Sequence, residues 1–128
     1  MKAVRRLPRH VYHLAEAANW PSIQRLGLLP AKALIDRSGI RGRMRERLLM
    51  EQRKRHLVLS EGCEVRDQRP MPAEALSTCL IGMTVADWYR LINAHVYFWL
   101  DPARLNRQRV ACGDRPQLVL VADAAALV

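Results

Sequence analysis

Apolar residues follow two spacings along this chain of 128 residues, one typical of strands and the other typical of helices. Short runs rich in β-branched and aromatic residues predict strands at residues 11–14, 56–59, around 65, 94–100 and 116–122. Apolar positions three or four residues apart predict helices after Asn19, within 30–37, over 40–55, after Pro72, after Thr84 and over 103–111. This order predicts an α+β fold of small mixed sheets with flanking helices.

Local signals mark the ends of some of these elements. Thr84 followed by Asp87 resembles a capping box, and Asp101 followed by Pro102 is a helix cap with a proline in the first turn. The run at residues 94–100, AHVYFWL, has three consecutive aromatic residues and is the strongest strand prediction. We therefore expect that run to form the central strand.

The size of the chain suits one compact core, so residues 1–128 are expected to form a single domain. No stretch approaches the roughly 18 apolar residues of a membrane span, and the N-terminus has no signal-peptide pattern. Cys63, Cys79 and Cys112 are far apart and include no CxxC pair, which gives no support for a disulfide framework or a zinc finger. These features favour a cytoplasmic protein without a membrane partner.

The net charge of +9 favours polyanionic partners such as nucleic acid, anionic membranes or phosphate-rich cofactors. Residues 37–55 concentrate this charge, with eight lysines and arginines against Glu46 and Glu51. The basic residues at the centre and end of this run are Arg41, Arg43, Arg45, Arg47, Arg53, Lys54 and Arg55. The run fits either an exposed amphipathic helix with a solvated face or a polyanion-binding surface.

Motifs of the common enzyme classes are missing from the sequence. It contains no GxxxxGK[ST], GxGxxG, HExxH or GxSxG pattern. The four histidines, at positions 10, 13, 56 and 95, are too scattered to resemble a metal site, so no metal is expected.

Three segments carry a more specific pattern: VYHLAEAANWPSIQRLGLL from Val11, RDQRPM from Arg66, and DWYRLINAHVYFWLDPARL from Asp87. Over nearly the whole chain they resemble an uncharacterised bacterial family with the motifs YHLAEAxNWPSIxxxGLL, RDQxPM and WYxLLNxxVFFW in this order. The first and third segments are more distantly similar to the DarT-type DNA ADP-ribosyltransferase toxins, with their YHIT and FYFNPRSPM segments. The resemblance implies an ADP-ribosyltransferase-like domain that binds NAD and modifies nucleic acid or protein.

The resemblance also implies cofactor-binding roles for Tyr12, His13, Tyr97, Trp99 and Arg104. Transfer requires NAD to be held bent, with a hydrogen-bonding residue at the ribose and aromatic rings around the nicotinamide. In a strand, Tyr97 and Trp99 would share one face and line a cleft opposite the strand of His13. The same aromatic residues also fit the core of a central strand.

Arg66 in the RDQ motif is the candidate catalytic residue, because a guanidinium can hold a phosphate or a substrate base by bidentate contact. The alternative is an ordinary ion pair with Asp67 in a turn. Arg104 matches the arginine that follows the aromatic strand of the toxins, and its alternative is a solvated residue in the first turn of a helix.

One feature of such transferases has no counterpart in the sequence. They use a late glutamate to stabilise the oxocarbenium-like ribose, yet this chain has no glutamate after Glu74. Asp114 and Asp123 lie in no matching motif, and the chain ends soon after its last predicted strand, which suggests a missing C-terminal part. We therefore expect poor or no ADP-ribose transfer by these 128 residues.

Two other functions fit the same sequence. A basic nucleic-acid-binding module without catalysis would use the arginine-rich run for phosphates and the aromatic residues for stacking on bases of DNA or RNA. A degenerate homologue would have neither activity. An antitoxin or immunity protein is a further partner to consider from the resemblance.

Overall fold

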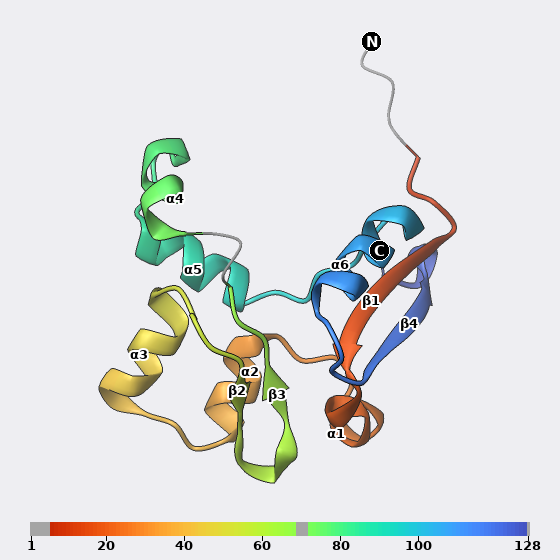
Figure 1. The fold of residues 1–128 in the computed structure, drawn as a ribbon, viewed down its shortest axis with the longest axis horizontal. Helices are drawn as coiled ribbons and strands as arrows, with labels where there is room; N and C mark the ends of the chain where they lie inside the picture. Colours follow the sequence, from red (N-terminus) through yellow and green to blue (C-terminus); the bar gives the residue numbers. More distant parts are fainter. Residues whose placement is uncertain (1–5, 69–71, 128) are drawn as a thin grey trace. The chain divides into compact units, whose positions relative to one another are not determined.

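The computed structural model describes residues 6–68 and 72–127, in which six α-helices accompany two separate sheets of two antiparallel strands each (Figure 1). The elements are β1 (His10–Glu16), α1 (Trp20–Leu26), α2 (Ala31–Arg37), α3 (Gly42–Met50), β2 (Leu57–Val58), β3 (Glu64–Val65), α4 (Ala73–Cys79), α5 (Val85–Asn93), α6 (Pro102–Ala111) and β4 (Gln117–Asp123). The predicted α+β class is confirmed, although both sheets are antiparallel rather than mixed. Within the described ranges, no helix is long and apolar enough to cross a membrane.

Contacts divide the chain into two compact units, which we describe separately. The first unit holds the described residues up to Trp20 and from Tyr97 onwards, and the second is Pro21–Val96. The expectation of a single domain over residues 1–128 stays a prediction.

The first unit is built on the antiparallel ladder between β1 and β4. This ladder runs from His10 opposite Asp123 to Glu16 opposite Gln117 (Figure 1). Helix α6 packs against β1. The buried apolar residues of the unit are Val11, Leu14, Ala15, Leu105 and Ala124. Because residues of one strand alternate between faces, β1 offers His13 on one side of the sheet and Tyr12 on the other.

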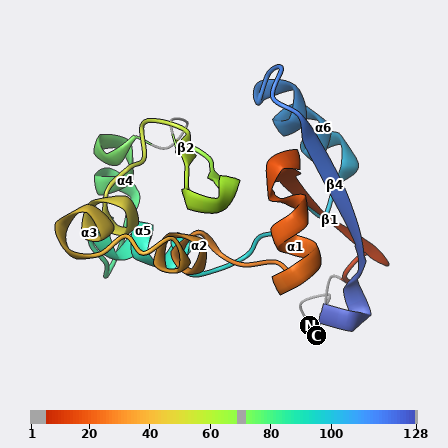
Figure 2. The same cartoon turned by 90° about the horizontal axis from the view of Figure 1, so that it is seen from below.

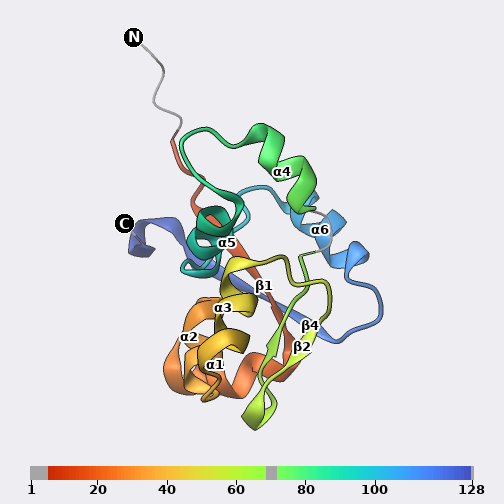
Figure 3. The ribbon, with the colours of Figure 1, turned by 90° about the vertical axis from the view of Figure 1, so that its left-hand side faces the viewer.

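The second unit gathers α1 from Pro21 onwards, the helices α2 to α5 and a short hairpin. Helix α3 packs against both α2 and α5, and α4 packs against α5 (Figure 2). The β2–β3 hairpin turns through Glu61 and Gly62, which have φ angles of 66° and 81° (Figure 3). The buried apolar residues here are Ile35, Leu49, Leu59, Val65 and Tyr89. The central helices therefore share one small core.

The helix predicted over residues 40–55 is shorter than expected. Helix α3 ends at Met50, and the next residue, Glu51, is extended. The backbone after it pairs with the RDQ segment instead: Gln68 N donates to Arg53 O at 2.7 Å, and Arg53 N donates to Gln68 Oε1 at 2.9 Å. This non-local pairing prevails over local helix propensity. Arg53, expected on an exposed face, is buried.

The prediction of a central strand at residues 94–100 is wrong. Ala94 belongs to the end of α5, and Asp101 already caps α6, so both neighbouring helices limit the run. One residue of it, Trp99, forms a β-bridge, to Tyr12 of β1. Tyr97 is 56% exposed. The aromatic content indicated a buried strand, but most residues of the run either belong to a helix cap or are exposed to solvent.

Candidate functional site

The first unit brings together the two segments on which the NAD-binding hypothesis depends. Tyr12 N donates to Trp99 O at 2.9 Å, and Trp99 N donates to Tyr12 O at 2.6 Å. His13 Nδ1 donates to Tyr97 O at 2.9 Å. The two segments are thus hydrogen-bonded directly, and the cleft expected between them is closed by their own backbones. A ligand would have to lie on a face of this pairing.

The contact to Tyr97 O also defines the chemistry of the His13 ring. A carbonyl oxygen can only accept, so Nδ1 must carry a proton. In the neutral ring Nε2 is then the acceptor nitrogen. The ring centroid of His13 lies 5.8 Å from that of Phe98, with the two planes tilted by 58°. The histidine is therefore held by both the backbone and a ring of the aromatic run.

The aromatic residues of this run have different environments. Tyr97 is exposed, although partial burial of its hydroxyl raises its pKa, and Trp99 is half-buried beside β1. The two do not share the face of a regular strand, because Trp99 is the strand-like residue of the run. The shared aromatic face that we expected is replaced by one paired tryptophan and one exposed tyrosine.

Arg104 lies in the first turn of α6 and is exposed to solvent. The helix begins as predicted, with Asp101 Oδ1 accepting a hydrogen bond from Ala103 N at 2.9 Å. This cap fixes the turn from which Arg104 projects. Its position agrees with both the cofactor-binding interpretation and the solvated alternative.

Arg66, the candidate catalytic residue, belongs to the second unit. Its carbonyl oxygen accepts a hydrogen bond from Arg53 Nε at 3.1 Å, and its side chain is half-buried. The RDQ motif therefore has a clear structural role, because its backbone and Gln68 hold the segment after α3. A catalytic role for Arg66 stays a prediction.

Arg53 is the centre of a buried polar cluster that the sequence did not reveal. Its Nη1 donates to Asn93 Oδ1 at 2.6 Å and to Leu48 O at 3.1 Å. Asn93 Nδ2 in turn donates to Leu49 O at 3.0 Å. Burial lowers the pKa of Arg53 to about 10, against the attraction of Asp67, so the residue is charged at neutral pH. The cluster ties α3, α5 and the RDQ motif together.

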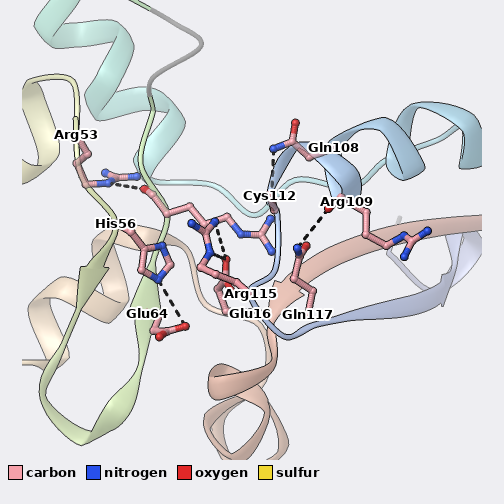
Figure 4. A network of polar contacts seen from close by, with 10 residues as sticks. Glu16, Arg53, His56, Glu64, Gln108, Arg109, Cys112, Arg115 and Gln117 are labelled. Atoms are coloured by element: carbon pink, nitrogen blue, oxygen red, sulfur yellow. Dashed lines mark hydrogen bonds and ion pairs between the residues drawn. The ribbon is translucent and has the colours of Figure 1, made fainter.

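A second buried charge lies in the first unit, at the end of β1. Glu16 is 2% exposed, and its Oε1 accepts from Arg115 Nε at 3.3 Å and lies 3.2 Å from Arg115 Nη2 (Figure 4). Gln117 Nε2 donates to Arg109 O at 3.4 Å, which ties α6 to β4. Sequence spacing gave no signal for the Glu16–Arg115 pair, because its partners are 99 positions apart.

The β2–β3 hairpin carries a separate polar pair. His56 Nε2 lies 3.5 Å from Glu64 Oε2 (Figure 4). Both side chains are largely buried, with 19% of His56 and 23% of Glu64 exposed. The pair becomes an ion pair when His56 is protonated. It links the residue before β2 to the first residue of β3.

Comparisons with known proteins give one match. The sequence matches a family of unknown function (DUF7002) over residues 9–128. This span includes all six candidate residues, the cluster around Arg53, the Glu16–Arg115 pair and the His56–Glu64 pair. No curated protein matches the chain, and no solved structure matches it.

Proposed function

The chain belongs to this family of unknown function, and we propose that its first unit is an ADP-ribosyltransferase-like domain that binds NAD. One observation carries the proposal: the Tyr12–Trp99 bridge and the His13–Tyr97 hydrogen bond join segments 84 or more positions apart. These are the segments on which the resemblance to DarT-type transferases rests. Their pairing brings both segments together, which supports a shared ligand site on one face of it.

Four of the candidate residues have a role in this proposal. His13, protonated at Nδ1, offers an acceptor nitrogen of the kind that a ribose hydroxyl needs. Trp99 and Tyr97 offer aromatic faces for the nicotinamide ring. Arg104 supplies a permanent positive charge for the pyrophosphate.

If the site holds every group that the reaction needs, its activity is ADP-ribose transfer to nucleic acid or protein. The step would need a carboxylate near the ribose, since such groups typically contribute about 3–4 kcal/mol to the stability of a charged transition state. Glu16 does not offer this in the structure, because it is buried and held by Arg115. We expect NAD binding to exceed transfer activity.

Calorimetric titration of the full chain with NAD tests the proposal. We expect a dissociation constant between about 1 μM and 1 mM, or about −8 to −4 kcal/mol. His13→Ala should weaken binding at least tenfold, about 1.4 kcal/mol, because it removes the acceptor and the ring beside Phe98.

The matched control for this titration is His10→Ala, because His10 is exposed on the same strand. It should bind NAD as the wild type does, and circular dichroism should show that both variants are folded. The absence of both heat and a thermal shift at millimolar NAD with folded protein would rule out the cofactor. Unchanged affinity in His13→Ala would remove that histidine from the site.

A second function is favoured by a different observation in the second unit. Arg43 and Arg47 lie four residues apart on α3, and both are exposed. Residues at this spacing lie on the same side of a helix, so the two guanidiniums can contact one phosphate backbone. A basic nucleic-acid-binding surface on α3 is therefore the alternative proposal.

A further inference from the structure

The second unit contains a pocket of about 400 Å³ between α2, α3 and α5. Leu49, Met50 and Ala94 give it an apolar part. Its volume falls in the range of about 300–1,000 Å³ that is usual for small-molecule sites. None of the functions considered above uses this pocket.

Three cations line the pocket, one from each helix. Lys32 comes from α2, Arg45 from α3 and Arg90 from α5, while Glu46 adds one acid. None of the ion pairs found among residues 6–68 and 72–127 involves Lys32. The lining therefore has two more positive than negative groups.

Carboxylates outside the lining hold the two arginines in place. Arg45 donates from Nε to Asp36 Oδ1 at 2.5 Å and from Nη2 to Oδ2 at 3.3 Å. Arg90 donates from Nη1 to Asp87 Oδ1 at 3.3 Å, and Asp87 is itself part of the cap of α5. Each guanidinium has five N–H groups, so donors remain for a ligand.

The surrounding charge also favours an anion. Residues 31–50 hold six lysines and arginines against Asp36 and Glu46, a net charge of +4. Arg45, and to a lesser extent Lys32, lowers the pKa of Asp36, as expected where positive charge prevails. Even with Asp36 included, this part of the unit attracts negative ligands.

We propose that this pocket binds a phosphate group attached to an aromatic ring system, as in a mononucleotide. The phosphate contacts Lys32, Arg45 and Arg90, and the ring system lies on Met50 and Ala94. The same chemistry is present in a free mononucleotide and at the 5′-phosphate end of a nucleic acid. The site consists of second-unit residues alone and is independent of the NAD site proposed in the first unit.

Calorimetry with adenosine monophosphate, adenosine and inorganic phosphate tests the site in the full chain at low salt. Adenosine monophosphate should bind at least tenfold more tightly than either part, because it uses both the cations and the apolar surface. Lys32→Gln should weaken binding at least fivefold. Ala94→Phe should abolish it by filling the pocket without a change of charge.

Arg37→Gln is the matched control, since Arg37 is exposed on the same helix as Lys32 and does not line the pocket. It should leave affinity within twofold of the wild type. Equal losses in Lys32→Gln and Arg37→Gln would overturn the site, because bulk charge would then explain the binding. No binding at millimolar adenosine monophosphate by folded protein would overturn it as well.

A tetranucleotide with and without a 5′-phosphate distinguishes the two sources of the ligand. A preference of tenfold or more for the phosphorylated form, lost in Lys32→Gln and Ala94→Phe, would identify a nucleic-acid end. Binding of adenosine monophosphate without such a preference would identify a free nucleotide. Tetranucleotide binding that ignores the 5′-phosphate, together with no response to adenosine monophosphate, would contradict the proposal.

Discussion

Arg53 shows how one buried charge can organise a unit of this small protein. Its guanidinium donates to the carbonyl oxygens of Leu48 and Arg66 and to the side chain of Asn93. A buried charge is tolerated when its donors are satisfied and a counter-charge is near, and Asp67 provides that charge. Arg53 therefore stabilises the second unit through the placement of its hydrogen bonds as much as through its charge.

Replacement of Arg53 by methionine should lower the free energy of unfolding by about 3–5 kcal/mol, because it removes three hydrogen bonds, one of them to the buried Asn93, and leaves Asp67 without its counter-charge. Urea denaturation followed by circular dichroism measures this change. The control is Arg55→Met, which alters an exposed arginine two positions away and should cost less than about 0.5 kcal/mol. Similar stabilities for the two variants would show that water replaces the guanidinium at little cost.

At this scale the sequence predicted some contacts and not others. The neighbourhood of His13 and Tyr97 came from the resemblance, since no local pattern joins residues 84 positions apart. Neither the Arg53–Asn93 contact nor the Glu16–Arg115 pair has such a motif, and their partners are 40 and 99 positions apart. Side-chain pairs of this kind depend on the final packing, which one sequence does not contain.

Elements whose signals are local were predicted well. Thr84 accepts from Asp87 N at 3.1 Å, and Asp87 Oδ2 accepts from Thr84 N at 3.2 Å, which completes the capping box expected for α5. The strands expected at 11–14, 56–59, around 65 and 116–122 are also present, but one element that depends on a distant partner was predicted wrongly. The run at 94–100 has strand-like residues, but β1 pairs with it at Trp99 alone and takes β4 as its long partner.

Thr84→Ala should lower the free energy of unfolding by about 1 kcal/mol, within a usual range of about 0.5–2 kcal/mol for the loss of a cap. The reason is that the first turn of α5 loses an acceptor for Asp87 N. Thermal and urea denaturation measure the loss. Thr78→Ala is the control, because Thr78 is exposed and its hydroxyl donates to Ala75 O within α4. A smaller loss in Thr84→Ala than in Thr78→Ala would show that the box adds nothing.

For the whole molecule, the structure divides the basic run of residues 37–55 into groups with different roles. Arg45 is paired with Asp36, and Arg53 is buried. The exposed cations of the run are Arg37, Arg41, Arg43, Arg47, Lys54 and Arg55. The net charge of +9 therefore overstates the positive surface that one helix can offer to a polyanion. The exposed cations of α3 are Arg43 and Arg47.

If α3 is a nucleic-acid surface, the double variant Arg43→Glu/Arg47→Glu should weaken binding to labelled single- or double-stranded oligonucleotides at least tenfold. Wild-type affinity should also fall steeply with salt, because each contacted phosphate of duplex DNA releases about 0.9 counterions. Fluorescence anisotropy between about 50 and 200 mM salt measures both effects. The control is Arg6→Glu/Arg9→Glu, whose positions are exposed and lie outside the second unit. Both double variants reduce the net charge from +9 to +5, so any difference between them reflects position. Equal losses would mean that only overall charge matters, and α3 would then be a solvated helix.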